Sequence, residues 1–126
     1  MQYLTQAEEI RSIITKIASA KTLWLDTETA DWQSPNPKVS LIQVLAEPED
    51  LTGDRAYVLD VLDKPEVVAY FVDQIMADPK IEKVFHNANY DVKFLGKEQA
   101  QNVTCTWKMA KKLKKRNLPI SYNYLT

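Results

Sequence analysis

The chain has 126 residues, 45% of them hydrophobic, and a formal net charge of −1, which suits one globular domain with a buried core and excludes two. No apolar run approaches the ~20 residues of a membrane helix, and the N-terminus shows no signal-peptide pattern, so we expect a cytoplasmic protein without a membrane partner. The single cysteine, Cys105, excludes an internal disulfide and has no His or Cys partner at zinc-ligand spacing.

The first predicted elements are a helix and three strands. Isoleucines at the spacing of one helix face predict an amphipathic helix over residues 6–19, and Thr5 and Glu8 predict a capping box at its start. Three apolar segments then read as strands, over residues 22–29, 39–46 and 56–62. Because the connections between these strands are short, we expect an antiparallel meander.

A second helix and a further strand follow. Pro65 in a first turn and an apolar stripe that stops before Asp78 predict a helix over residues 64–77. Residues 81–86 then form a short strand. This strand is reached through a helix, so we expect it to be parallel to one of the earlier strands.

The last predicted elements are two helices around a brief strand. The first helix begins after Asn87 and is closed by Gly96 as its C-cap. Residues 97–105 hold a loop and a brief strand, and the final helix runs from Thr106 to Arg116. This order of elements indicates an α/β layered fold with a mixed sheet.

Two acidic residues interrupt the strand predicted over residues 22–29. Asp26 and Glu28 lie two positions apart, so their side chains share one face of the strand. At roughly 7 Å and an effective dielectric constant near 20, the two charges repel by about 2 kcal/mol. A hard divalent cation such as Mg²⁺ or Mn²⁺ would offset this repulsion. Alternatively, the strand simply runs out into solvent at Asp26, and this stretch alone favours that alternative.

A third acid, Asp91, lies in the first turn of the helix that follows Asn87. Acids favour the first turn of a helix through its dipole alone. However, the ligands of α/β sheets gather outside the carboxyl ends of strands, where both Asp26 and Asn87 fall. If the two strands are neighbours, Asp26, Glu28 and Asp91 converge.

The second half of the chain is basic. Residues 64–126 hold 11 bases and 6 acids, whereas residues 1–63 hold 5 bases and 11 acids. Most of the excess lies in the last predicted helix, in Lys108, Lys111, Lys112, Lys114, Lys115 and Arg116. These cations form either a solvated helix face or a contact with a phosphate backbone, and the run itself favours neither.

Two segments carry a resemblance to a known family. They are Trp24-Leu25-Asp26-Thr27-Glu28-Thr29 and Val84-Phe85-His86-Asn87-Ala88-Asn89-Tyr90-Asp91-Val92-Lys93-Phe94-Leu95. Together they resemble the first and second motifs of the DEDD 3′-5′ exonucleases, particularly the ribonuclease D group. The connecting segments also look like that group's, so the resemblance covers nearly the whole chain. A lone Asp-x-Glu is a weak signal, whereas this pair in a matching framework is specific.

The resemblance implies a ribonuclease H-like three-layer fold and hydrolysis of 3′-terminal phosphodiesters with two Mg²⁺ or Mn²⁺ ions. By motif position, Asp26, Glu28 and Asp91 correspond to the catalytic, metal-binding carboxylates of the family. The expected partner is nucleic acid, in particular the 3′ ends of single-stranded RNA, contacted by Thr29, Asn87, Lys111, Lys112 and Lys115.

One part of the family pattern is missing. The third motif, a Tyr or His followed four residues later by a metal-binding Asp, does not occur in the 126 residues. Residues 118–126 resemble the family sequence that precedes the helices leading to that motif. We therefore expect residues 1–126 to form a single exonuclease-like domain that is the N-terminal part of a longer family domain.

These patterns leave two functions open. The chain is either a 3′-5′ exonuclease using Asp26, Glu28 and Asp91, or a catalytically incomplete module of the same fold. Such a module would bind nucleic acid, self-associate or assemble with a completing chain. A small-molecule phosphatase is a weaker alternative, because the sequence shows no nucleophile motif for it.

Overall fold

The structure, a computed structural model, describes residues 1–31 and 33–115. The elements follow the order β1 (Gln2–Leu4), α1 (Ala7–Ile17), β2 (Thr22–Ala30), β3 (Lys38–Leu45), β4 (Tyr57–Asp60), α2 (Pro65–Phe71), η1 (Val72–Met76), β5 (Glu82–Phe85), α3 (Ala88–Val92), β6 (Val103–Cys105) and α4 (Thr106–Lys115). The single π-helical turn η1 continues α2. The predicted helix end at Arg116 and the family-like segment 118–126 lie outside the described residues.

All six described strands form one sheet in the order β1-β4-β3-β2-β5-β6. Strands β2, β3 and β4 pair antiparallel, which confirms the predicted meander. Strand β5 pairs parallel with β2, and β6 pairs parallel with β5. The expected α/β fold with a mixed sheet is therefore confirmed. Strand β2, which carries Asp26 and Glu28, and strand β5, which precedes Asp91, are direct neighbours.

Strand β1 was not predicted from the sequence. It has three residues, two of them exposed, and it pairs parallel with β4 at the edge of the sheet. A segment this short has no alternation of apolar and polar residues from which a strand is recognised. Its Leu4 is nevertheless buried and joins the hydrophobic core.

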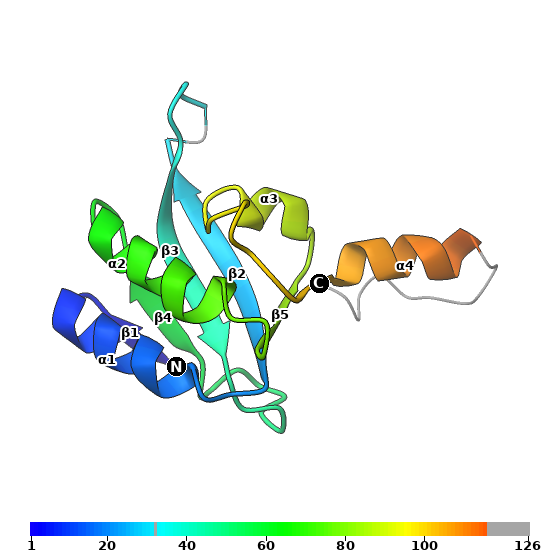
Figure 1. Ribbon diagram of the computed structural model, residues 1–126, viewed down its shortest axis with the longest axis horizontal. Coiled ribbons are helices and arrows are strands. Elements are labelled where there is room, and N and C mark those ends of the chain that lie inside the picture. Colours follow the sequence, from blue (N-terminus) through cyan, green and yellow to red (C-terminus); the bar gives the residue numbers. More distant parts are fainter. Residues whose placement is uncertain (32, 116–126) are drawn as a thin grey trace.

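Helices α1 and α2 lie side by side across one face of the sheet (Figure 1). The predicted stripe of α1 faces the core, where Ile10, Ile14 and Ile17 are buried against alternate residues of β2, among them Leu23 and Leu25. Helix α4 projects away from this body. No helix in the described part of the chain is long and apolar enough to cross a membrane.

The predicted capping box at the start of α1 is wrong. Gln6, rather than Thr5, is the N-cap, and no side chain caps the helix. The backbone carbonyl of Gln6 accepts the N–H of Ile10, so the helix starts one residue later than the pattern suggests. Helix α2 likewise begins after Lys64 without a side-chain cap, although Pro65 occupies its first turn as predicted.

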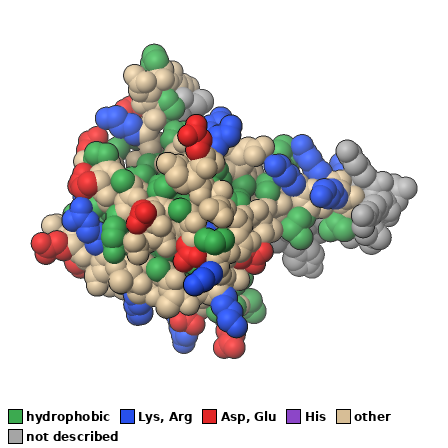
Figure 2. All heavy atoms as spheres, viewed as in Figure 1, with side chains coloured by type: hydrophobic (Ala, Val, Ile, Leu, Met, Phe, Trp, Pro, Cys, Tyr) green, Lys and Arg blue, Asp and Glu red, His purple; other side chains and the backbone are tan. Residues whose placement is uncertain are grey.

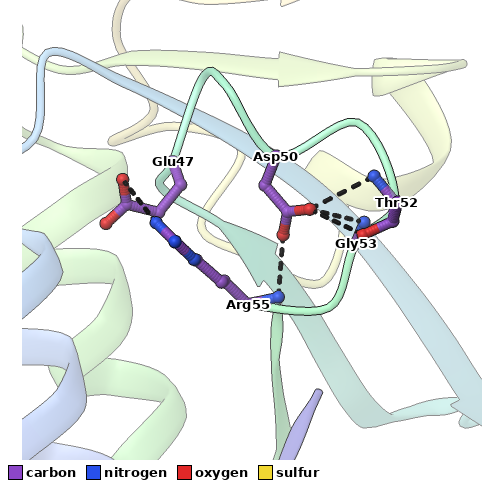
Figure 3. A network of polar contacts seen from close by, with 5 residues as sticks. All are labelled: Glu47, Asp50, Thr52, Gly53 and Arg55. Carbon is purple, nitrogen blue, oxygen red and sulfur yellow. Dashed lines mark hydrogen bonds and ion pairs between the residues drawn. The ribbon is translucent and has the colours of Figure 1, made fainter.

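The connection between β3 and β4 is organised around one carboxylate, Asp50 (Figure 3). Its Oδ1 accepts the backbone N–H groups of Thr52 and Gly53 at 3.1 Å, and its Oδ2 accepts that of Arg55 at 2.7 Å. The bond from Arg55 is the largest cause that lowers the pKa of Asp50 to about 2. Backbone donors therefore hold this exposed turn in shape.

Candidate active site

The site forms where β2 continues beyond its neighbour. Pairing between β2 and β5 ends at Trp24 and Val84, but β2 runs on to Ala30. The chain leaves β5 through Asn87, whose φ of 60° is left-handed, and turns directly into α3. Asn tolerates the left-handed conformation better than most residues, so the turn can form at this position. As a result of the turn, α3 lies beside the unpaired edge of β2.

The two acids of β2 share one face of the strand, as predicted. Asp26 and Glu28 are exposed, whereas Thr27 between them is buried on the opposite face. Their partners across the antiparallel pairing are Gln43 and Leu41 of β3. Asp26 also lines a cavity of about 670 Å³ on this open face of the sheet, together with neighbours from three other segments: Gln43, Val84, His86 and Thr106.

The third acid, Asp91, lies against Thr27. The Thr27 backbone N–H donates to Asp91 Oδ1 at 3.1 Å, and the Thr27 hydroxyl donates to the same oxygen. Asp91 is 3% exposed, and this burial raises the pKa of its carboxyl group. The hydrogen bonds from Thr27 oppose that rise, and the negative charge of Asp26 adds to it.

The carboxylate oxygens of these acids are the type of ligand that a hard divalent cation prefers. Asp26 and Asp91 are close enough for one charge to act on the other, and a cation would relieve both this repulsion and the burial of Asp91. Within residues 1–31 and 33–115, however, no three His, Cys, Asp or Glu side chains form a group that could hold a metal. One oxygen of Asp91 is engaged by Thr27 instead.

The other predicted contacts lie around these acids. The hydroxyl groups of Thr29 and Tyr90 are 2.9 Å apart and hydrogen-bonded, which joins β2 to α3. Asn87 is exposed at the start of α3. His86 is exposed and hydrogen-bonded through Nδ1 to the Thr106 hydroxyl at 3.0 Å.

Sequence reasoning missed two members of this site. Thr27 holds Asp91, and Tyr90 holds Thr29, yet neither was a candidate. Alternation along β2 puts Thr27 on the face opposite the acids, so the strand pattern does not connect it with them. The signal that identifies Thr27 is its position at the unpaired end of a central strand, where its N–H has no strand partner from β5.

The predicted lysine contacts of α4 have different surroundings. Lys112 lines a cavity between α3 and α4. The Lys111 Nζ lies 3.5 Å from the centre of the Trp107 ring, in a cation–π contact. Lys115 is the last residue of the helix. The run of cations is therefore not one continuous surface.

Comparison with known proteins gives the family. The 3′-5′ exonuclease family model matches residues 1–126. No curated protein matches the chain. The catalytic core of RRP6 from Trypanosoma brucei is 21% identical with a TM-score of 0.72, covering 98% of this chain and 32% of its own.

Two ribonuclease D structures are similar as well. RNase D of Trypanosoma brucei in complex with RNA U12 is 23% identical, with a TM-score of 0.63, covering 83% of this chain and 37% of its own. Escherichia coli RNase D is 17% identical, with a TM-score of 0.63, covering 97% and 35%. The chain thus spans about a third of the length of these three relatives. With a family match along its full length, the chain belongs to the 3′-5′ exonuclease family.

Proposed function

We propose that this chain carries the first part of a metal-dependent 3′-5′ exonuclease site that hydrolyses the 3′-terminal phosphodiester of single-stranded RNA. The observation that carries this proposal is the bond between Asp91 and Thr27, 64 positions apart, which joins the two acidic segments at one end of the sheet. The relatives support RNA as the substrate class, since one was solved with RNA and another is described as an exoribonuclease.

Asp26, Glu28 and Asp91 are the residues that would hold the metal ions. Enzymes of this family are metal-dependent, and the bound ions, Mg²⁺ or Mn²⁺, supply an activated water and stabilise the leaving oxygen. Asp91 is suited to its role because its backbone position is set by α3 and its carboxylate by Thr27. Thr29 and Asn87, at the rim of the site, would contact the 3′ nucleotide.

A second candidate is a nucleic-acid-binding or assembly module without turnover. It is favoured by the absence of a three-residue metal group among the described residues and of a Tyr or His followed four residues later by Asp in the sequence. Such a module would keep its basic surface and would self-associate or bind a completing chain. Sedimentation velocity across a range of concentrations tests this, since a monomer at every concentration would argue against self-association.

Cleavage of an RNA labelled at its 5′ end, with protein in excess and Mn²⁺ present, discriminates the two candidates. Shortening from the 3′ end that disappears in Asp26→Asn supports the exonuclease. The matched control is Asp54→Asn, the same substitution at an exposed aspartate of the β3–β4 connection. Binding without any shortening, or shortening that survives in Asp26→Asn, would contradict the exonuclease proposal.

A further inference from the structure

A second cavity, of about 670 Å³, lies between α3 and α4. Four lysines line it, and none of its lining residues from the described part of the chain is acidic: the cations are Lys93, Lys97, Lys108 and Lys112. We call these four residues and the space between them the lysine groove. Cys105 and Met109 also line it.

The groove gathers cations that are separate in the sequence. Lys93 follows α3 and Lys97 follows the Gly96 turn, whereas Lys108 and Lys112 lie one helical turn apart on α4. The Lys108 Nζ donates to the side-chain oxygen of Asn89 at 3.4 Å, which links α4 to α3. The position of α4 relative to α3 therefore creates the groove, and the lysine run alone does not.

The four charges have no carboxylate partners among the described residues. Other cations are paired, since Lys38, Arg55 and Lys64 form ion pairs in other parts of the fold. Four ammonium groups around one concave surface repel one another and favour an anionic ligand there. Figure 2 shows lysine side chains gathered over the projecting helix α4.

Two neighbouring lysines of α4 differ in whether they line the groove. Lys112 lines the groove, but Lys111 is not among its lining residues and lies over the Trp107 ring instead. A charge that is held on an aromatic face is already partly satisfied. The groove residue Lys93 also lies over a ring, that of Tyr90, but at the longer distance of 5.7 Å from the ring centre. Lys111 and Lys112 are adjacent in sequence and chemically identical, so they distinguish a groove from a run of charge.

We propose that the lysine groove binds the phosphate backbone of the RNA strand upstream of its 3′ end, a proposal that rests on the proposed exonuclease function. One helix, α3, serves both sites: Asp91 faces β2, whereas Asn89, Val92 and Lys93 face the groove. Only this short helix separates the acids from the groove, so an RNA strand whose 3′ end lies at the acids needs to pass only α3 to reach the lysines. Lysines bind phosphates as point charges and need no fixed geometry, which suits a flexible single strand.

Single lysine substitutions test the groove by fluorescence anisotropy with a labelled RNA of about 12 nucleotides. EDTA is present so that hydrolysis plays no part. For single strands, each phosphate contact contributes about 0.7 to the slope of log affinity against log salt concentration. The loss of one contact should therefore lower the affinity about fivefold at ~0.1 M salt. We expect Lys112→Gln and Lys93→Gln to show these losses. The control is Lys111→Gln. The family resemblance counts Lys111 among the nucleic-acid contacts, but its charge lies over the Trp107 ring and outside the groove, so its loss should weaken binding by less than about twofold.

Cys105 provides an independent footprint of the groove. It is the only cysteine of the chain, it is half-buried, and it lines the groove. Saturating RNA should slow the alkylation of Cys105 by uncharged iodoacetamide in the wild type and in Lys111→Gln. At the same RNA concentration, Lys112→Gln should lose much of this protection. The intact mass of the protein reports the extent of alkylation.

Three results would contradict the proposal that the lysine groove binds RNA. They are equal losses in Lys111→Gln and Lys112→Gln, unchanged binding in Lys93→Gln, and alkylation of Cys105 that saturating RNA leaves unaffected. Stronger protection by polyglutamate than by RNA would assign the groove to an acidic protein instead. None of these readouts requires turnover, so failure of the groove is distinguishable from failure of the exonuclease proposal, which the Asp26→Asn cleavage assay reports separately.

Discussion

Asp91 is a carboxylate whose negative charge the fold disfavours. Its pKa is raised above the ordinary value of 3.8, first by burial and further by the charge of Asp26. A raised pKa contributes stability that is complete below 3.8 and is lost as the pH rises through the folded-state value. At neutral pH the ionised group therefore opposes folding.

The substitution Asp91→Asn should consequently stabilise the protein at neutral pH. The amide removes the charge and keeps an oxygen that accepts both bonds from Thr27. Urea unfolding measures the free energy of unfolding of both proteins. The difference in this free energy between the variant and the wild type should shrink as the pH falls toward 3.8, because the wild-type carboxyl group then becomes protonated. The exposed control Asp54→Asn should change stability by less than about 0.5 kcal/mol. A destabilised Asp91→Asn would mean that the ionised carboxylate supports the fold.

The same variant should bind Mn²⁺ more weakly than the wild type. A hard cation depends on the number and charge of its carboxylate ligands, and an amide oxygen is neutral. Calorimetric titration with Mn²⁺ measures this, with Asp26→Asn as a second loss of a ligand. Undiminished binding in both variants would place the metal elsewhere in the chain.

Residue spacing alone predicted part of this chemistry. Alternation placed Asp26 and Glu28 on one face of the strand, which the structure confirms, and both residues are exposed there. The partners of Asp91 and Lys111 could not be predicted, because each depends on which side of a helix meets which neighbour. Sequence periodicity identifies the face of an element, whereas contacts between elements follow from their packing.

At the scale of elements, Gly96 sets the direction in which the chain continues after α3. Its φ is +76°, and a Cβ there would lie 2.5 Å from Val72 Cγ1 and 3.0 Å from Gln99 Oε1. The predicted C-cap thus has two functions: it permits a left-handed turn, and it admits the close approach of η1. Only glycine satisfies both.

Comparing two alanine substitutions separates these functions. Gly96→Ala should destabilise the protein by about 2–4 kcal/mol, from the left-handed strain together with the overlap with Val72. Gly53→Ala carries only the strain, because φ is +80° and nothing lies within 4 Å of its Cβ position, so we expect about 1–2 kcal/mol. Urea unfolding checks both, and equal losses would show that the contact with Val72 relaxes freely.

Long, strongly patterned elements were predicted closely, and short ones were not. The isoleucine stripe of α1 and the apolar strands β2 and β3 emerged near their observed bounds. The three-residue β1 was not predicted, because it is stabilised by pairing in the sheet and not by a local pattern. The helix predicted over residues 64–77 covers both α2 and η1, but its pattern does not reveal the π-helical turn at its end. The crossover rule predicted that β5 is parallel to one of the earlier strands, and the structure shows that this strand is β2, a pairing that creates the candidate site.

At the scale of the whole molecule, the charge asymmetry of the sequence becomes a division of surfaces. Acids at the end of β2 face the open side of the sheet, and the lysines that line the groove come from residues 93–112. Helix α3 stands between the two. Under the two proposals, a phosphate backbone would lie on one side of α3 with its 3′ end at the carboxylates on the other, and substitutions on the two sides would affect binding and hydrolysis separately.

The isolated 126-residue chain should therefore bind single-stranded RNA weakly and with a steep salt dependence, and cleave it very slowly. Phosphate contacts from the lysines are electrostatic and do not depend on the metals. Hydrolysis with two ions requires every ligand at once, and groups that act as a unit fail together when one is missing. The sequence supplies three candidate carboxylates and no Tyr or His with an Asp four residues later. We expect a rate several orders of magnitude below that of Escherichia coli RNase D, measured on the same labelled RNA with Mn²⁺. Rapid trimming that Asp26→Ala abolishes would instead show that another residue or a second chain replaces the missing motif.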